Sequence, residues 1–295
     1  MFGLQRVGDL AWLAGDMRAR GFLLGGTAGR TTLNGEGLQH EDGHSHLLAS
    51  TIPNCVSYDP TFAYEVVTII REGMRRMYEA QEDVYYYITL MNENYPHPGL
   101  GEAGQGAEEG ILKGLYLLKD GGKAAQKKLR VQLMGSGSIL REVVAAADLL
   151  KSDFGVVADI WSATSFNELR RDGMAVERWN LLHPTEQRRK SWVESQLSGH
   201  DGPVIASTDY MRNFADQIRE YVQAAGRRYV VLGTDGFGRS DYRKHLRRFF
   251  EVDRHYVVVA ALKALADDGA IKPALVAEAI AKYKLDTGRA APWTV

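Results

Sequence analysis

Apolar and polar positions along the first third of the chain follow two different periods. Residues 1–20 and 62–77 repeat apolar side chains at helical spacing. Residues 21–26, 54–58 and 84–90 are instead short apolar or β-branched runs, which indicate buried strands. The segments 54–58, 62–77 and 84–90 follow the order strand, helix, strand. We therefore expect them to form part of a parallel α/β sheet.

The rest of the chain continues this alternation. Its predicted strands lie at residues 129–134, 156–161, 203–206 and 229–232, and its predicted helices at 138–151, 166–182, 210–225, 242–249, 253–267 and 273–283. We therefore expect an α/β fold whose later part has helices on both faces of a mostly parallel sheet.

Two polar segments rich in glycine divide the chain. Residues 92–106 contain two prolines and four glycines, and residues 121–128 form a second polar break. We therefore expect a first domain at residues 1–105, a linker at 106–128 and a second domain at 129–295. The second domain is long enough to bury a core of its own.

The composition excludes several classes of protein. Of 295 residues, 45% are hydrophobic and 25% charged, which is typical of a globular protein. Basic and acidic side chains number 36 and 37, so nothing indicates binding to nucleic acid or to a membrane surface. No apolar run has the ~18 residues of a membrane span, and no signal peptide is visible. Because Cys55 is the single cysteine, we expect a cytoplasmic location without disulfides.

The run TTLNGEGLQHEDGHSH, residues 31–46, carries the densest chemistry of the chain. It combines histidines with carboxylates and is interrupted by glycines. Histidines titrate near neutral pH and carboxylates orient them, so we expect an active-site loop here. Glu36 lies four residues before His40, from where it could hold the tautomer of the imidazole by a hydrogen bond.

The same run contains His40-Glu41-Asp42-Gly43-His44, which matches the zinc-hydrolase pattern H-E-x-x-H. That zinc site requires both histidines on one face of a helix. The glycines in and beside the motif each cost roughly 1 kcal/mol in a helix interior, and no apolar stripe supports a helix. We therefore favour a loop without metal, while a zinc site on a loop, using His46 as a third ligand, stays open without spacing support.

Polar and glycine-rich segments follow three other predicted strands. Asn92, Glu93 and Asn94 come directly after the third strand, where open α/β sheets bind ligands, so we expect them to line a cleft. Residues 135–138 lack the third glycine of a dinucleotide motif, which favours a tight turn over an anion site. Residues 233–241 lack the lysine of a phosphate loop, which favours a structural or interface loop.

Long motifs of the chain resemble the homodimeric bacterial pyruvate dehydrogenase first component. They include residues 31–46, 85–89, 92–95, 133–141 and 232–241. The resemblance covers nearly the whole chain but only the carboxyl-terminal third of that family. It implies the second half of a thiamine diphosphate-binding domain of the pyrimidine type, followed by a transketolase C-terminal-like domain.

The resemblance also implies a function. Members of the family decarboxylate pyruvate on thiamine diphosphate with magnesium, and they reductively acetylate the lipoyl group of dihydrolipoyl acetyltransferase. The resemblance makes His40 and Glu36 catalytic and assigns His44 and His46 to loop support and cleft lining. The main cofactor ligands are expected upstream of Met1, so we expect the chain alone to bind no cofactor and to be inactive.

Two other functions stay open. The chain could be a truncated module for dimerisation or assembly without catalysis, and the zinc hydrolase is a remote alternative. A first domain without its initial strands would leave a sheet edge and apolar faces uncovered. We therefore expect residues 1–105 to depend on missing sequence or on a partner.

Overall fold

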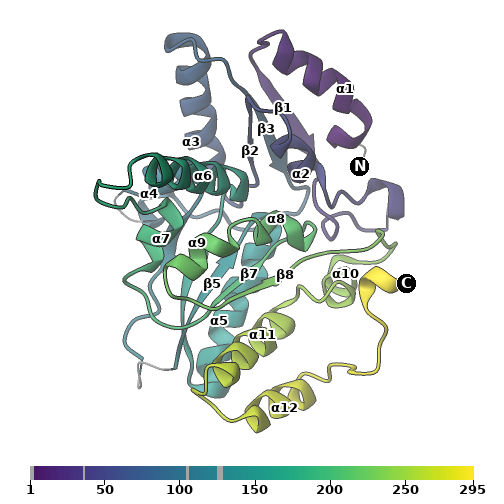
Figure 1. Ribbon diagram of the computed structural model, residues 1–295. Coiled ribbons are helices and arrows are strands. Elements are labelled where there is room, and N and C mark those ends of the chain that lie inside the picture. Colours follow the sequence, from purple (N-terminus) through teal and green to yellow (C-terminus); the bar gives the residue numbers. More distant parts are fainter. Residues whose placement is uncertain (1–2, 36, 104–105, 125–128) are drawn as a thin grey trace.

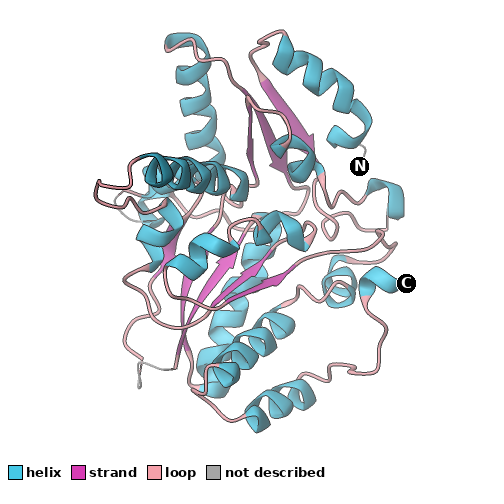
Figure 2. Ribbon diagram, in the orientation of Figure 1, coloured by secondary structure: helices cyan, strands magenta, loops and turns pink. Residues whose placement is uncertain are grey.

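Two separate β-sheets organise the chain, and helices cover them (Figures 1 and 2). This computed structural model describes residues 3–35, 37–103, 106–124 and 129–295. The smaller sheet contains the early strands and lies at the top of Figure 1, with the larger sheet below it. The predicted α/β fold with mostly parallel strands is confirmed.

The first sheet has three strands in the order β1-β3-β2, and both strand pairs are parallel. Its strands are β1 (Phe22–Gly26), β2 (Cys55–Tyr58) and β3 (Tyr85–Leu90), and its helices are α1 (Gly3–Asp16), α2 (Ser45–Ser50) and α3 (Ala63–Met74), which a π-helical turn extends to Glu79. The carboxylate of Glu65 starts α3, because it accepts hydrogen bonds from the backbone N–H groups of Thr61 (2.5 Å) and Phe62 (2.9 Å).

Within the described residues, the second sheet has five strands in the order β4-β6-β5-β7-β8, of which only β4 runs antiparallel to its neighbour. Its strands are β4 (Tyr116–Lys119), β5 (Arg130–Gly135), β6 (Val157–Ser162), β7 (Val204–Ser207) and β8 (Tyr229–Leu232). The later helices are α5 (Leu140–Phe154), α6 (Phe166–Leu182), α7 (Trp192–Leu197), α8 (Arg212–Asp216), α9 (Arg219–Ala224), α10 (Arg243–Phe249), α11 (Arg254–Asp267) and α12 (Pro273–Lys282). None of the described helices combines the length and the apolar character needed to cross a membrane.

Helices cover both faces of the second sheet, as predicted. Leu133 and Ile205 belong to the same apolar cluster as the buried faces of α5 and α11. Met134 and Ala206, the next residues along β5 and β7, belong to a second cluster with α6, α7, α8 and α9. This alternation follows from the two-residue period of a strand.

The structure differs from the predicted elements in several places, and helix α7 lies in a segment where no helix was predicted. The predicted linker at 106–128 contains α4 (Ala107–Lys113) and the strand β4, because the apolar run beginning at Leu115 is buried at the edge of the second sheet. The single helix predicted at 210–225 is two short helices, α8 and α9, and α2 lies in a segment predicted to be a loop. The domain boundaries themselves stay a prediction.

The carboxyl ends of the two sheets face each other. The backbone N–H of Asp59, after β2, donates to the carbonyl of Thr164 after β6 (2.8 Å), and the N–H of Gly137 after β5 donates to the carbonyl of Asp59 (3.1 Å). The side-chain amide of Asn167 on α6 donates to the carbonyl of His46 on α2 (2.8 Å). The ends of the parallel strands therefore form one polar junction, where α/β folds place their ligands.

Candidate active site

The histidine segment lies at this junction, between β1 and α2. Residues Leu38–His40 form a single 3-10 turn, which starts after Gly37 in a conformation (φ 84°) that glycine adopts without strain. His40 is the last residue of the turn, and its side chain is half-buried. Glu36, predicted to orient His40, lies outside the described residues.

Asp42 organises the start of α2. Its carboxylate oxygen Oδ1 accepts hydrogen bonds from the backbone N–H groups of His44 (3.1 Å) and Ser45 (3.0 Å). These bonds satisfy donors that a helix start otherwise leaves free, and they fix the direction in which the segment enters the helix. His44 is half-buried at this position, immediately before α2.

His46 lies in the interior between the sheets, with no exposed surface, so the structure places it in the core and not in an open cleft. Its Nε2 is 3.0 Å from the hydroxyl of Thr89 at the end of β3. Its ring stacks on Phe214 and meets Tyr210 edge-on, with ring centres 4.7 Å apart in both cases. Burial lowers the pKa of His46 to about 3, so the imidazole is neutral at neutral pH.

The polar residues after β3 do not share one environment. Asn92 and Asn94 are exposed, whereas Glu93 is partly buried. The carboxylate of Glu93 accepts a hydrogen bond from Arg141 on α5 (2.7 Å) and pairs with Arg247 on α10. Burial acts to raise the pKa of Glu93, but the hydrogen bond from Arg247 and the nearby arginine charges lower it overall. Glu93 therefore joins β3 to two helices of the second sheet.

Asp59 and Asp209, two buried carboxyl groups at the junction, were not singled out as site residues from the sequence, and a third, Glu41, was named only as part of the zinc-hydrolase pattern. Asp59 accepts hydrogen bonds from the hydroxyls of Thr89 and Ser136, both at 2.7 Å, and burial raises its pKa to about 7. Burial likewise raises the pKa of Asp209 to about 7 and that of Glu41 to about 8. Asp59 and Asp209 each follow a predicted strand, so the rule that selected Asn92 would also have found them.

Arg30 lies among these acids, packed against the backbone of Gly43. A Cβ atom at position 43 would lie 2.1 Å from Nε of Arg30, so only glycine allows this approach. Burial lowers the pKa of Arg30, while the charges of Asp42, Glu41 and Asp209 act in the opposite direction. The histidine segment therefore folds around the buried cation of Arg30 and several buried acids.

Several polar atoms at the junction have no hydrogen-bond partner among the described residues. They are Nε of Arg30, Oε1 of Glu41, Oδ2 of Asp42, Nδ1 of His46 and Oδ1 of Asp209. Buried polar atoms are normally paired, and unpaired ones mark places where water or a bound molecule completes the network. Both donors and acceptors are present, so the junction can bind a molecule with hydrogen-bonding groups of either kind.

The structure does not contain the helix that the zinc-hydrolase alternative requires between His40 and His44. Between His40, at the end of a 3-10 turn, and His44, before α2, the backbone is not helical. The carboxylate of Glu41 instead accepts the backbone N–H of Arg239 (2.7 Å). In the described part of the chain, no group of three or more His, Cys, Asp and Glu side chains is arranged to hold a metal ion.

The glycine-rich loop 233–241 packs against the histidine segment. Besides the bond from Arg239 to Glu41, the hydroxyl of Ser240 donates to the carbonyl of Gly35 (2.9 Å), and the N–H of Gly35 donates to the carbonyl of Asp241 (3.0 Å). These contacts agree with the predicted structural or interface loop. The second half of the chain therefore holds the histidine segment in place.

Two family models match the chain. The pyruvate dehydrogenase E1 component middle domain matches residues 1–98, and the transketolase-like C-terminal domain matches residues 114–253. The pyruvate dehydrogenase E1 component of Pseudomonas aeruginosa is 66% identical over 292 residues, and that of Escherichia coli K12 is 58% identical over 295 residues. Each alignment covers 99% of this chain and 32% of the relative, so the chain spans about a third of the length of these relatives.

Solved structures of transketolases share the fold. Transketolase from Leishmania mexicana aligns with a TM-score of 0.63 at 15% identity, covering 90% of this chain and 33% of that one. A split-gene transketolase, described as an inactive β4 tetramer, aligns with a TM-score of 0.54 at 17% identity, covering 83% of this chain and 66% of that one. At such low identity these similarities establish the fold alone.

Proposed function

The chain belongs to the pyruvate dehydrogenase E1 component family, of which it represents about a third, and on this premise we propose that it is the carboxyl-terminal part of a pyruvate-decarboxylating enzyme. The observation that carries the proposal is an identity of 58–66% to such enzymes along 99% of the chain. In this proposal the complete protein decarboxylates pyruvate and reductively acetylates the lipoyl group of dihydrolipoyl acetyltransferase. It works as a cytoplasmic homodimer within a multienzyme complex.

The residues at the junction fit one wall of a thiamine diphosphate site. His40 is half-buried on a turn at the carboxyl ends of parallel strands, and Glu41 and His46 each keep a buried polar atom unpaired. When bound, the coenzyme supplies the carbon nucleophile and the electron sink for decarboxylation. The groups that hold its diphosphate and magnesium belong, in this proposal, to a part of the complete protein outside this chain.

In the proposed mechanism His40 is the residue that meets the substrate. An imidazole donates a hydrogen bond to the carboxylate or carbonyl oxygen of a 2-oxoacid in one protonation state and accepts a proton in the other. A positioned group of this kind contributes about 10²–10⁴-fold in rate. Glu36 orients the imidazole of His40, and His44 lines the cleft beside it together with Asn92 and Asn94.

His46 and Glu93 are positioning residues in this proposal. A fully buried, neutral imidazole with its pKa near 3 carries no charge to substrate, but it fixes α2 against β3 and α8. Glu93 anchors the end of β3 to α5 and α10 through arginine. Together they hold the turn that presents His40.

The test joins this chain to the preceding two thirds of the Pseudomonas aeruginosa relative, since that relative is 66% identical to the chain. We expect the joined protein to release carbon dioxide from pyruvate when thiamine diphosphate and magnesium are added, and each part alone to release none. A joined protein that is folded and binds the cofactor, yet turns over no pyruvate, would overturn the proposal.

Calorimetry on the 295-residue chain alone tests where the cofactor ligands lie. We expect no heat of binding with thiamine diphosphate and magnesium at micromolar concentrations. Binding at micromolar concentrations would show that this chain holds the main ligands itself.

A second candidate function, an assembly module without catalysis, is favoured by one feature. Leu10 and Met17 of the α1 region are 65% and 71% exposed, and Leu24, on the edge strand β1 of the first sheet, is 55% exposed. Apolar surface of this kind is normally covered by another part of the protein or by a partner. Association of the chain with itself, without pyruvate turnover in the joined protein, would favour this candidate.

A further inference from the structure

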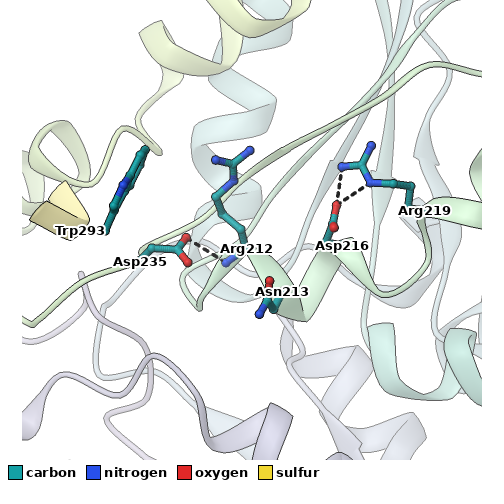
Figure 3. A pocket seen from close by; sticks show the side chains of 6 residues that line it. All are labelled: Arg212, Asn213, Asp216, Arg219, Asp235 and Trp293. Atoms are coloured by element: carbon teal, nitrogen blue, oxygen red, sulfur yellow. Dashed lines mark hydrogen bonds and ion pairs between the residues drawn. The ribbon is translucent and has the colours of Figure 1, made fainter. Parts of the chain in front are cut away.

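A hollow of about 410 Å³ lies on the second half of the chain and is lined in part by Asp235 of the loop 233–241. Figure 3 shows the six side chains that line it: Arg212, Asn213, Asp216, Arg219, Asp235 and Trp293. They come from α8, α9, the loop after β8 and the short 3-10 turn Pro292–Thr294. A hollow of this volume accommodates a small organic molecule.

One positive charge in the hollow is not balanced by a direct partner. Arg219 is paired with Asp216, with Nε 2.9 Å from Oδ1, and a carboxylate oxygen of Asp235 accepts the backbone N–H of Arg212 (3.1 Å). The guanidinium of Arg212 has no hydrogen bond or ion pair to another described residue. In Figure 3 it projects between Trp293 and the Asp216–Arg219 pair. A guanidinium in this state offers paired donors to a carboxylate or phosphate.

A flat apolar surface stands opposite this charge. Trp293 is 54% exposed, and its indole faces the space beside Arg212 (Figure 3). Large aromatic side chains are usually buried, and an exposed indole beside a free guanidinium offers a face on which a second ring can stack. Carboxylates of Asp216 and Asp235 at the border of the hollow are able to accept hydrogen bonds from hydroxyl or amino groups.

We propose that this hollow binds a small ligand in which a flat ring is joined to an anionic group. The ring stacks on Trp293, and the phosphate or carboxylate is bound by Arg212. A ring alone would contact only Trp293, and an anion alone would contact only Arg212. The hollow therefore favours molecules that carry both groups.

The hollow is connected to the histidine segment through the backbone. The N–H of Met211, next to Arg212, donates to the carbonyl of Gly43 (2.8 Å). The loop that contains Asp235 also contains Arg239, whose N–H holds the carboxylate of Glu41 (2.7 Å). A ligand that tightens α8 and this loop therefore restrains the segment that carries the candidate catalytic residue.

The experiment is calorimetry on the 295-residue chain with four probes. Adenosine 5′-monophosphate carries ring and phosphate, indole-3-acetate carries ring and carboxylate, adenosine carries only the ring, and inorganic phosphate carries only the anion. We expect at least one of the two ring-bearing anions to bind with a Kd below about 1 mM and at least tenfold more tightly than adenosine or phosphate. The comparison of the first two probes decides whether the anion is a phosphate or a carboxylate.

Variants identify the residues. Arg212→Ala and Trp293→Ala should each weaken binding about tenfold without changing thermal unfolding, because both side chains are exposed. Arg228→Ala, on an exposed arginine outside the hollow, should leave binding unchanged. Binding should also slow amide hydrogen exchange at residues 41–43 in the unaltered chain.

Three results would overturn the proposal. They are absence of binding by both ring-bearing anions at millimolar concentration, binding that survives both alanine variants, and phosphate binding as tightly as either ring-bearing anion. Unchanged exchange at residues 41–43 in the presence of bound ligand would overturn the connection to the histidine segment. None of these results depends on pyruvate turnover, so they are distinguishable from a failure of the proposed function.

Discussion

Burial is the largest cause of the shifted protonation of Asp59, Asp209 and Glu41. Their pKa values of about 7, 7 and 8 mean that these groups retain protons under conditions in which exposed carboxyl groups are ionised. A protonated carboxyl group donates a hydrogen bond as well as accepting one. The polar junction beside the histidine segment is therefore sensitive to pH near neutrality.

The residue-scale prediction concerns Asp209→Asn. The pKa of Asp209 is raised from an ordinary value near 3.8 to about 7, so the folded state binds more protons than the unfolded state between these limits. Its contribution to the free energy of unfolding is present at low pH and is lost as pH rises through about 7. Asparagine stays neutral, so the variant should be more stable than the unaltered chain at pH 8, by on the order of 4 kcal/mol, with little difference near pH 4.

Urea unfolding at the two pH values measures this difference. Asp148→Asn, an exposed acid on α5, is the matched control and should not change the dependence on pH. His46 has the opposite effect on the pH dependence. Its pKa is lowered to about 3 in the folded state, so the unfolded state binds more protons below about pH 6.5, and the free energy of unfolding decreases as pH falls below that value. Equal stabilities of the Asp209 variant and the unaltered chain at pH 8 would contradict the assigned shift.

Residue types and spacing located the histidine segment but not the environment of each histidine. The glycines around His40 disfavour a long helix, and this local property was readable from the sequence. The burial of His46 was not, because it depends on Tyr210 and Phe214, more than 160 positions later in the chain. Glu93 was selected correctly as a residue at a strand end, but its arginine partners come from distant helices.

At the scale of elements, arginine–carboxylate pairs tie the first sheet to the second. Glu93 follows β3, and its partner Arg247 on α10 is only 7% exposed. Breaking a buried pair by removing one charge leaves the other without compensation. We predict that Glu93→Gln lowers the free energy of unfolding by about 3 kcal/mol in urea denaturation. Glu278→Gln, on the exposed side of α12, should cost little, and equal losses in the two variants would contradict this role.

The apolar surface of α1 and β1 carries the second prediction at this scale. Replacing Leu10 and Leu24 by lysine removes exposed apolar area and places charge at a sheet edge. Light scattering of the isolated chain should therefore show a smaller average mass for the double variant. Leu181→Lys, on an exposed position of α6, is the control and should leave the mass unchanged. An unchanged average mass of the double variant would show that this apolar surface does not cause the chain to self-associate.

The strands in apolar runs and the long helices were predictable, whereas β4 and α2 were not. The predicted bounds of the long helices α6 and α11 agree with the structure to within one residue. The strand β4 has four residues between two polar breaks, and its pairing with β6 comes from tertiary contacts. The helix α2 has six residues and is stabilised by Asp42 and by packing around His46, which spacing alone does not reveal.

For the whole molecule, the structure predicts where the second domain begins. Ile111 of α4 and Leu115 are fully buried, and β4 pairs with β6, although these residues lie in the predicted linker. A chain of residues 106–295 should therefore unfold at higher urea concentration than a chain of residues 129–295. Limited proteolysis of the full chain should leave the longer fragment. Equal stability of the two fragments would contradict a structural role for α4 and β4.

The claim that the turn at residues 38–40 supplies an active-site histidine is tested most directly by His40→Ala in the protein joined to the Pseudomonas aeruginosa part. The rate of pyruvate decarboxylation is measured together with the affinity for thiamine diphosphate. We predict a loss of about 10²-fold or more in rate with unchanged cofactor affinity, whereas His245→Ala on the exposed surface of α10 keeps full activity. Full activity of the His40 variant would contradict the claim.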